Sequence, residues 1–148
     1  MFNKKNILVT GGTGSFGSKF IFKLLNEYNI QKILIYSRDE AKQFKMQSEL
    51  TKFKNKIEYV LGDIRDYNRL SEVMNNVDYL LHSAALKQVP AAEFNPSEFI
   101  KTNILGTENT IKAAINAKVK KCIMLSTDKA SNPINLYGAT KLVADKLF

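Results

Sequence analysis

Short runs of apolar residues alternate along this chain with longer stretches in which apolar residues recur at helical spacing. The runs predict five strands, near residues 7–10, 33–37, 57–61, 78–82 and 122–127. The longer stretches predict helices near residues 16–28, 40–53, 68–75 and 97–117, and a last helix that begins near Leu136. Strands that alternate with helices in this way indicate right-handed crossovers and a parallel sheet covered on both faces.

The predicted fold class is therefore α/β, a doubly wound parallel sheet of Rossmann type with strand order 3-2-1-4-5. Its ligand crevice is expected between the first and fourth strands. The chain makes one domain, residues 1–148, which no linker divides. Because the sequence stops inside its last helix, we expect the final strands and the substrate cap of such a fold to be missing. The fifth strand would then be an exposed edge.

The first predicted strand runs directly into a glycine-rich turn, with glycine at every third position before and into the first helix. Such a turn lets backbone N–H groups approach a pyrophosphate at the positive end of the helix. A plain tight turn is the alternative, but the flanking strand and helix supply the context that a dinucleotide site requires. The predicted cofactor-binding residues of this turn are Gly11, Thr13, Gly14, Ser15, Phe16 and Gly17.

The second strand ends in Ser37 and Arg38, where an NAD site usually carries Asp or Glu to accept hydrogen bonds from the ribose. A hydroxyl and a guanidinium suit a 2′-phosphate better. Asp39 follows one or two positions too late for the ribose contact. We therefore predict NADP as the cofactor, bound by Ser37, Arg38 and Lys42. The alternative is that Arg38 is a surface cation.

Further candidate cofactor contacts follow the third and fourth strands. Asp63 is expected to accept a hydrogen bond from the adenine amino group, with Ile64 beside the ring. The alternative is a helix N-cap, which fits Asp66 better than Asp63. Ser83, Ala84 and Ala85 form a small-residue stretch that a nicotinamide ribose can approach, with Ser83 and Ala84 as the predicted contacts.

The last segment of the chain carries its densest chemistry. Tyr137 and Lys141 lie one helical turn apart, so the ammonium would lower the tyrosine pKa from about 10 and make the phenol a base near neutral pH. Thr127, at the predicted carboxyl end of the fifth strand, would relay the hydrogen bond of a substrate hydroxyl. Tyr28 and Lys32 repeat the spacing at a helix-to-strand junction. Position after the fifth strand, and not spacing, therefore selects Tyr137.

The charge of the chain changes this picture little. The formal net charge is +8, yet only three of the 22 basic residues are arginine and the lysines are scattered. This favours phosphorylated small molecules as partners, and no nucleic-acid-binding module is visible. Lys87, in the loop after the fourth strand, is a candidate for contacting a substrate phosphate and, equally, an exposed lysine.

Several other site classes are excluded by what the sequence lacks. The single cysteine, Cys122, excludes an internal disulfide and fits a reducing cytoplasm. No apolar run is long enough for a signal-peptide core or a membrane span. His82, the only histidine, has no clustered partners, so we predict packing and no metal site. The G-x-S-x-G elbow of a hydrolase is absent.

With the glycine turn, Asp63 and the Tyr137–Lys141 pair in this order, the chain resembles the extended short-chain dehydrogenase/reductase family. Residues 36–40, 84–90, 101–104, 126–130 and 132–141 look like its polysaccharide-biosynthesis branch. Within that branch they are most similar to the inverting UDP-N-acetylglucosamine 4,6-dehydratases of pseudaminic acid synthesis. The resemblance covers essentially the whole chain.

The resemblance implies an NADP-dependent lyase that acts on a UDP-sugar. Tyr137, assisted by Thr127 and Lys141, would take the sugar O4 proton, and Tyr137 and Lys141 would also contact the cofactor. Lys129 would remove the C5 proton and Asp128 would protonate the departing C6 hydroxyl. Reprotonation at C5 from the other face would invert that centre. Lys129 can act as a base only if its pKa is depressed, and the alternative for both residues is a loop ion pair.

Family members continue well beyond this length, so we expect the uridine-binding residues to be absent and the chain alone not to turn over. The complete enzyme is expected to be a homo-oligomer. Two other functions stay open. A UDP-sugar 4-epimerase of the same family needs Tyr137 and Lys141 but no acid and base at Asp128 and Lys129. A non-catalytic dinucleotide-binding module needs only the cofactor residues.

Overall fold

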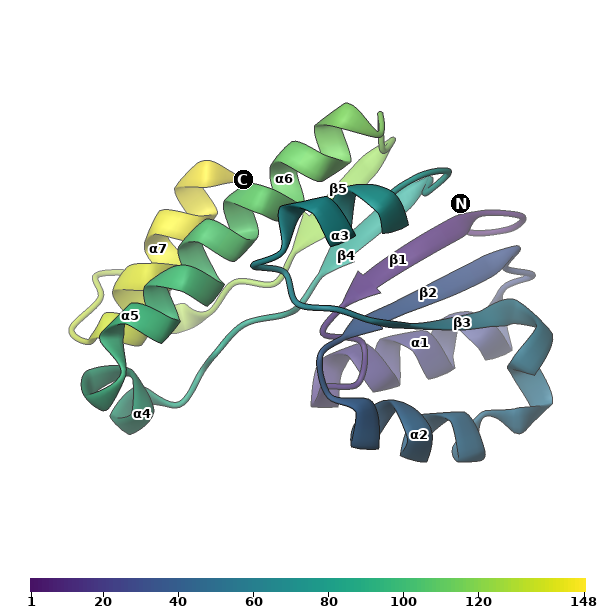
Figure 1. The fold of residues 1–148 in the computed structure, drawn as a ribbon, viewed down its shortest axis with the longest axis horizontal. Coiled ribbons are helices and arrows are strands. Elements are labelled where there is room, and N and C mark those ends of the chain that lie inside the picture. The colour runs from purple at the N-terminus through teal and green to yellow at the C-terminus, as the bar shows by residue number, and fades with distance from the viewer.

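The computed structural model describes residues 1–148 and contains one parallel five-stranded sheet in the order β3-β2-β1-β4-β5 (Figure 1). The predicted fold class and strand order are confirmed. The strands are β1 (Asn6–Thr10), β2 (Lys32–Ser37), β3 (Ile57–Leu61), β4 (Tyr79–His82) and β5 (Lys121–Met124). Thr10 is in register with both Tyr36 and His82, so β2, β1 and β4 end level at one edge of the sheet.

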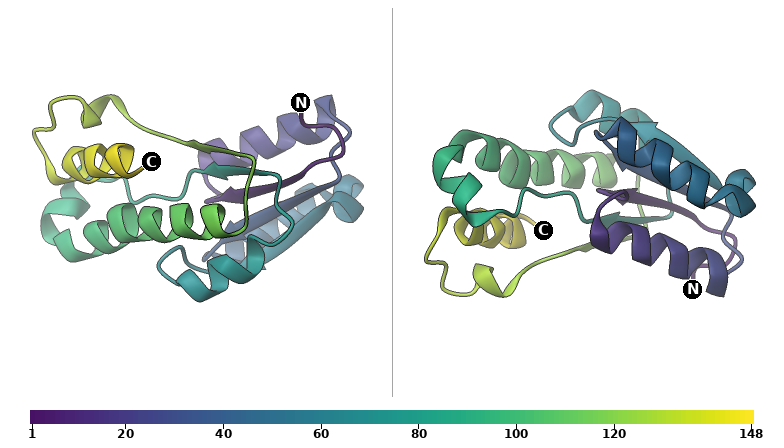
Figure 2. Two further views of the ribbon diagram at one scale, coloured as in Figure 1. Left: turned by 90° about the horizontal axis from the view of Figure 1, so that it is seen from above. Right: turned by 90° about the horizontal axis from the view of Figure 1, so that it is seen from below.

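Helices cover both faces of this sheet (Figures 1 and 2). α1 (Ser15–Glu27) and α2 (Glu40–Glu49) lie on one face, and α3 (Tyr67–Val73) and α6 (Gly106–Asn116) lie on the other. α4 (Val89–Phe94), α5 (Pro96–Phe99) and α7 (Leu136–Leu147) lie beyond the carboxyl ends of β4 and β5. Three short segments complete the fold: η1 (Thr51–Lys56), η2 (Ile100–Leu105) and η3 (Asp128–Ala130).

Alternate residues of β1 belong to two separate cores. Ile7 and Val9 pack with Ile21 of α1, whereas Leu8 packs with Leu70 of α3. All five side chains are essentially inaccessible to solvent, as expected for a central strand of a parallel sheet. Burying an aliphatic side chain of this size contributes about 1.5–3 kcal/mol. The strand that leads into the glycine turn is therefore held firmly from both faces.

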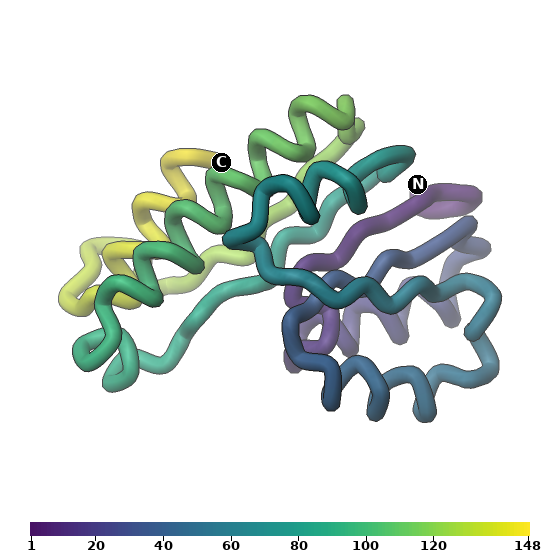
Figure 3. The backbone as a smooth tube through the Cα atoms, viewed as in Figure 1, coloured from purple at the N-terminus to yellow at the C-terminus, as the bar shows by residue number.

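Three details of the helices differ from the sequence expectations. The helix predicted over residues 97–117 is a continuous run from α5 to α6 whose middle, η2, is π-helical (Figure 3). The helix predicted to end near Phe53 ends at Glu49 and is followed by the 3₁₀ segment η1. Helix α4 was not expected. Pro90 lies in its first turn, where backbone N–H groups have no partner within the helix, so the N–H that proline lacks costs no hydrogen bond.

β5 is shorter than predicted. It ends at Met124, so the expectation that the strand runs to Thr127 is wrong. The Leu125 carbonyl accepts a hydrogen bond from the Lys141 ammonium and so does not continue the ladder, and Thr127 is the N-cap of η3. β5 pairs only with β4 and exposes Ile123, so it is an open edge as expected. None of the helices combines the length and apolar character that a membrane crossing requires.

Candidate functional site

The glycine turn between β1 and α1 is closely packed. Gly11 has a φ of +65°, and a Cβ there would lie 2.7 Å from the Ala84 amide nitrogen. A Cβ on Gly17 would lie 2.6 Å from the Gly11 carbonyl oxygen. Gly14 is the N-cap of α1 and supplies no side-chain hydrogen bond, so the first N–H groups of the helix remain available to an anion. The turn therefore fits the pyrophosphate of a dinucleotide.

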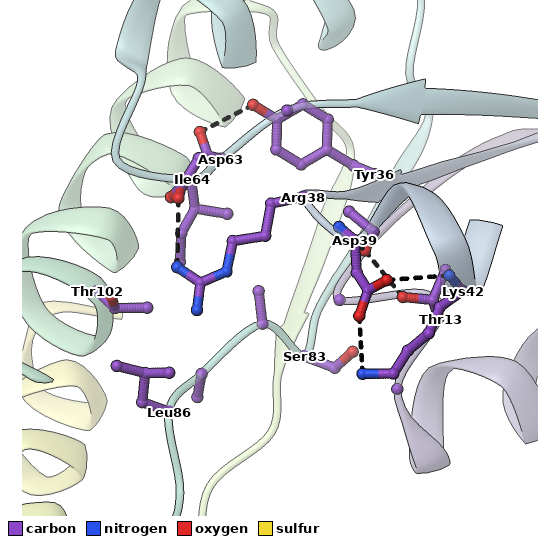
Figure 4. A pocket seen from close by; sticks show the side chains of 16 residues that line it. Thr13, Tyr36, Arg38, Asp39, Lys42, Asp63, Ile64, Ser83, Leu86 and Thr102 are labelled. Atoms are coloured by element: carbon purple, nitrogen blue, oxygen red, sulfur yellow. Dashed lines mark hydrogen bonds and ion pairs between the residues drawn. The ribbon is translucent and has the colours of Figure 1, made fainter. Parts of the chain in front are cut away.

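A cavity of about 280 Å³ opens beside this turn at the carboxyl edge of the sheet (Figure 4). The structure brings together in its walls ten of the predicted cofactor residues: Gly11, Thr13, Gly14, Ser37, Arg38, Lys42, Asp63, Ile64, Ser83 and Ala84. The walls also contain Ala85, the last residue of the predicted small-residue stretch, and five residues that the sequence analysis did not assign to the site: Tyr36, Asp39, Gly62, Leu86 and Thr102. Ser15, Phe16, Gly17, Tyr137 and Lys141 do not line it.

Two cations stand on the β2 side of the cavity. The half-exposed Arg38 extends over it, with Nη1 3.4 Å from Asp63 Oδ2 (Figure 4). Lys42 Nζ lies 2.9 Å from Asp39 Oδ2, and the Lys42 amide donates to Asp39 as the N-cap of α2. These two hydrogen bonds hold the pKa of Asp39 below its usual value. Asp39 is thus engaged by its own helix, whereas the long Arg38 contact leaves the guanidinium available to a phosphate.

The ends of β2 and β3 are tied together beneath these charges. The buried Gln43 donates from Nε2 to the carbonyl oxygens of Ser37 and Val60, both at 2.9 Å. The Tyr36 hydroxyl donates to the Asp63 carbonyl oxygen at 2.9 Å, and burial raises the pKa of this phenol to about 12. The Ser37 and Thr13 hydroxyls lie 2.8 Å apart. The floor of the cavity is therefore preorganised by hydrogen bonds of the predicted residues Thr13 and Ser37 and of two side chains, Tyr36 and Gln43, that the sequence analysis did not assign to the site.

Asp63 is less free than the sequence analysis assumed. Its Oδ1 accepts the Arg65 N–H at 3.0 Å, and its Oδ2 accepts the Arg65 guanidinium at 2.7 Å. Burial raises the pKa of Asp63, but the hydrogen bonds from Arg65 outweigh it and bring the net pKa below its usual value. The N-cap alternative is found at Asp66, which accepts from the Arg69 amide at the start of α3. The adenine contact of Asp63 stays a prediction.

Asn103 joins the cavity to helix α7. Its Oδ1 accepts from the Leu86 amide at 2.8 Å, and its Nδ2 donates to the Leu86 carbonyl at 2.9 Å and to Thr140 Oγ1 at 3.0 Å. Asn103 is buried, Leu86 lines the cavity, and Thr140 directly precedes Lys141. The sequence analysis gave Asn103 no role. The sequence signal that could have identified Asn103 is a polar residue at a position of the helical stretch that the apolar pattern predicts to be buried.

His82 forms part of the buried support of the same edge. Thr107 gives its hydroxyl proton to the Asn103 carbonyl, so His82 Nε2, 3.1 Å away, is the donor of that pair. His82 Nδ1 then accepts from Thr10 Oγ1 at 2.7 Å. Burial, with the charge of Lys141, lowers the pKa of His82 to about 3. The imidazole is neutral, in the predicted packing role, and no group of metal-ligating side chains surrounds it.

Tyr137 and Lys141 occupy the first two turns of α7, which Asn135 caps by accepting from the Gly138 amide at 2.8 Å. The buried Lys141 ammonium donates to the Leu125 carbonyl at 2.6 Å. Burial lowers the pKa of Lys141 below its ordinary value. Leu125 is itself hydrogen-bonded to the end of β4, so Lys141 lies at the same edge of the sheet as the glycine turn.

The three other predicted catalytic residues lie in and before η3. The Thr127 hydroxyl donates to Asp128 Oδ1 at 3.0 Å, and the Lys129 ammonium lies 3.3 Å from the same oxygen. The Asp128 side chain is 86% exposed and that of Lys129 is 49% exposed. The two form the loop ion pair that the sequence analysis gave as the alternative. Within these 148 residues, Lys129 does not have the burial that a lysine base requires.

Lys87 lies outside the main cavity. It lines a neighbouring hollow of about 290 Å³ together with Arg38 and Leu86, which border both spaces. Its side chain is exposed. The contact of Lys87 with a substrate phosphate stays a prediction.

The sheet order, the glycine turn at the switch between β1 and β4, and the Tyr-x-x-x-Lys helix after β5 together define a Rossmann-type domain of the short-chain dehydrogenase/reductase class. More particularly, a family model described as polysaccharide biosynthesis protein matches residues 7–148, and the chain belongs to this family. The resemblance seen in the sequence is thereby confirmed.

Two individual relatives show which enzymes of this family the chain is similar to. The UDP-N-acetylglucosamine 4,6-dehydratase (inverting) of Campylobacter jejuni subsp. jejuni serotype O:23/36 (strain 81-176) is 60% identical over 148 residues, which are 100% of this chain and 44% of the relative. The UDP-glucose 4-epimerase of Rickettsia akari (strain Hartford) is 49% identical over 150 residues, 99% of this chain and 43% of the relative. The chain therefore spans less than half the length of these curated relatives.

Solved structures agree with the fold. The structure of Pen from Bacillus thuringiensis superposes with a TM-score of 0.97 at 45% identity, covering 99% of this chain and 45% of that one. The dTDP-glucose 4,6-dehydratase DesIV from Streptomyces venezuelae, with NAD and TYD bound, superposes with a TM-score of 0.84 at 26% identity, covering 96% of this chain and 50% of that one.

Proposed function

We propose that this chain is the cofactor-binding and catalytic portion of an NADP-dependent, C5-inverting UDP-N-acetylglucosamine 4,6-dehydratase of polysaccharide biosynthesis, in the branch that leads to pseudaminic acid. The observation that carries the proposal is the cavity beside the glycine turn, joined through Asn103 to the helix that bears Tyr137 and Lys141. The 60% identity to a dehydratase of this name supports the choice of reaction.

The cofactor site is built from the glycine turn and the ends of β2, β3 and β4. The start of α1, which has no side-chain cap, would hold the pyrophosphate, and Ile64, Ser83 and Ala84 would border the adenine and the riboses. A bound NADP⁺ would supply reversible hydride transfer, taking a hydride from the sugar C4 and giving it back at C6. The chain's own residues bind, orient and move protons around that chemistry.

NADP in place of NAD is supported by the charges on the cavity wall. Arg38 is held only by a 3.4 Å contact to Asp63 and extends over the cavity. Lys42 stands beside it, and Ser37 occupies the end of β2 where an acidic residue would repel a phosphate. A planar guanidinium and an ammonium together suit a 2′-phosphate.

The catalytic assignments follow from placement along α7 and η3. Tyr137 accepts the proton of the sugar O4, because the buried positive charge of Lys141 one turn away stabilises the phenolate. Thr127 hydrogen-bonds the same hydroxyl. Lys129 removes the C5 proton that the new ketone has acidified, and Asp128 gives a proton to the departing C6 hydroxyl. A proton added to C5 from the opposite face inverts that centre.

The exposure of Lys129 limits what these residues do alone. The Lys129 side chain is 49% exposed and paired with Asp128, so it lacks the burial on which a lysine base depends. We therefore propose that turnover requires protein beyond these residues to exclude water from η3. Contact of Lys87 with the UDP-sugar, homo-oligomerisation and a cytoplasmic location belong to the same proposal.

Calorimetry tests the cofactor assignment directly. We expect NADPH to bind the chain at least about tenfold more tightly than NADH, because one charge-assisted phosphate contact contributes about 1.5–3 kcal/mol. Arg38→Ala should remove that preference while leaving NADH affinity unchanged. Arg69→Ala, which removes an exposed arginine paired with Glu72 on α3, is the matched control. Equal loss of both cofactors in Arg38→Ala, or no binding by the parent chain, contradicts the assignment.

Product analysis tests the reaction. The protein encoded by the complete gene, incubated with UDP-N-acetylglucosamine, should give a 4-keto-6-deoxy sugar with inverted C5. The second candidate is a UDP-sugar 4-epimerase, favoured by the 49% identity to the Rickettsia akari protein; it would give only the C4 epimer. Asp128→Asn separates the two, because it should abolish dehydration and spare epimerisation. Cofactor binding without any product would support a non-catalytic module.

A further inference from the structure

Asp145, in the last turn of α7, has an arrangement that the proposed reaction does not explain. It lies one helical turn after Lys141 and two after Tyr137, so the three residues share one side of the helix. Its Oδ2 accepts a short hydrogen bond from the Ser126 hydroxyl, in the segment just after β5. Its Oδ1 is buried and has no hydrogen-bond partner. A buried, half-satisfied carboxylate oxygen is costly unless a positive charge is near.

The buried ammonium one turn before Asp145, on the same side of the helix, is itself under-satisfied. The Lys141 ammonium has three donors, and one of them binds the Leu125 carbonyl. Lys141 is buried, and its ammonium and the Asp145 carboxylate do not form a direct ion pair. Burial lowers the pKa of Lys141, whereas the charge of Asp145 raises it. The charge of Asp145 thus compensates part of the desolvation of Lys141.

The other charged groups on the elements packed against α7 are already engaged. Asp128 pairs with Lys129 in η3, Glu98 of α5 pairs with Arg65 and with Lys101 of η2, and Glu108 of α6 pairs with Lys112. Glu93 of α4 accepts from the Leu136 amide at the opposite end of the helix. His82 of β4 is the remaining titratable neighbour of Lys141, and it is neutral. Asp145 is therefore the carboxylate positioned to balance this ammonium.

We propose that Asp145 is a positioning residue for the Tyr137–Lys141 pair: oriented by Ser126, its carboxylate keeps the buried Lys141 ammonium charged and directed at the end of β5. Lys141 must stay protonated for its charge to stabilise the phenolate of Tyr137. The catalytic meaning of this coupling rests on the function proposed above. The coupling itself does not, because it concerns two charges of the free chain.

The experiment titrates Lys141 in the 148-residue chain without any ligand. The ¹³Cε resonances of ¹³C-lysine-labelled protein are followed against pH, and Lys141 is assigned by the signal missing from Lys141→Met. In Asp145→Asn, which keeps size and shape, we expect the pKa of Lys141 to fall by about one unit or more. Asp145→Glu should restore most of the value, because the carboxylate returns one methylene further out.

Two further variants complete the test. Glu27→Gln removes the carboxylate from Lys23–Glu27, a pair with the same four-residue spacing on α1, and should leave Lys141 unchanged. Ser126→Ala should lower the pKa of Lys141 by less than Asp145→Asn does, because the charge stays but its orientation loosens. This second variant decides the matter if Asp145→Asn unfolds. An unchanged Lys141 pKa in a folded Asp145→Asn protein, or in Ser126→Ala if Asp145→Asn unfolds, overturns the proposal, whatever the cofactor experiments show.

Discussion

The proposed cofactor half of this edge of the sheet and the proposed catalytic half differ in how firmly the chain itself holds them. Around β1 and β2, Leu8, Val9 and Ile35 are completely buried, and Gly11 and Gly17 of the glycine turn leave no room for a methyl group. Around β5, Ile123 is exposed, and the proposed acid Asp128 is almost fully in solvent. The geometry of the proposed cofactor site is thus set by contacts within these residues, whereas the proposed acid–base chemistry depends on protein that excludes water from η3.

The largest expected contrast lies in the strands themselves. Leu8→Ala removes a fully buried side chain between the sheet and α3, so it should lower the free energy of unfolding by about 2–5 kcal/mol. Ile123→Ala, on the half-exposed face of β5, should change it by less than about 1 kcal/mol. Urea unfolding measures both. Equal losses would show that β5 is as well packed as β1.

Acid should weaken the buried support beneath the cavity. The pKa of His82 is about 3 in the fold and about 6.5 when unfolded, so the unfolded chain binds the proton first as the pH falls. The contribution of the neutral imidazole to the free energy of unfolding is fully present above pH 6.5 and is lost as the pH falls toward 3. We expect a loss of about 2–3 kcal/mol between pH 6.5 and 4.

The control for this titration is His82→Gln, which cannot take up the proton. At pH 6.5 this variant should be less stable than the parent chain, but its free energy of unfolding should change much less between pH 6.5 and 4. Urea unfolding at several pH values measures this. A pH dependence equal to that of the parent chain would assign the acid sensitivity to the carboxylates.

Within the glycine turn, the same substitution of glycine by alanine should have very different effects at Gly11 and at Gly14. Gly11→Ala places a Cβ against the Ala84 backbone at a positive φ, so we expect a loss of about 2 kcal/mol and no NADPH binding. Gly14→Ala has an ordinary φ, and its Cβ would lie 3.1 Å from its nearest neighbour, the Gly11 carbonyl oxygen. Gly14→Ala should therefore lower the free energy of unfolding much less than Gly11→Ala does. Thermal unfolding and calorimetry together separate the two, and equal behaviour would contradict the packing described for the turn.

The smallest contrast concerns two aspartates at helix starts. Asp66→Ala removes the N-cap of α3, which should cost about 1 kcal/mol of the free energy of unfolding. Asp128→Ala removes a solvated partner of Lys129 and should leave the melting temperature unchanged. A drop in melting temperature for Asp128→Ala would mean that η3 contributes to folding and not only to the proposed chemistry.

The sequence predicted the sheet and the cavity well for a physical reason. Strands such as 7–10 and 33–37 are buried on both faces, so their apolar runs and the glycine spacing between strand and helix carry the pattern directly. The structure accordingly places ten of the predicted cofactor residues around one cavity. Which of them contact a cofactor stays a prediction.

What the sequence did not show depends on contacts between distant segments. The roles of Asn103, Gln43 and Tyr36 arise from hydrogen bonds to carbonyl and amide groups elsewhere in the chain, which no local pattern encodes. The end of β5 was predicted three residues too late, because the apolar run continues through Leu125. The Lys141 ammonium takes the Leu125 carbonyl, so the ladder stops there.

The Asn103 amide has a thermodynamic consequence for the whole molecule. Leu86 can shift only by breaking two hydrogen bonds or by drawing Asn103, and with it Thr140, along. A molecule that enters the cavity and displaces Leu86 therefore either breaks these hydrogen bonds or does work on α7. Where the hydrogen bonds hold, reciprocity requires that a ligand that reorients α7 changes the affinity of the cavity by the same free energy.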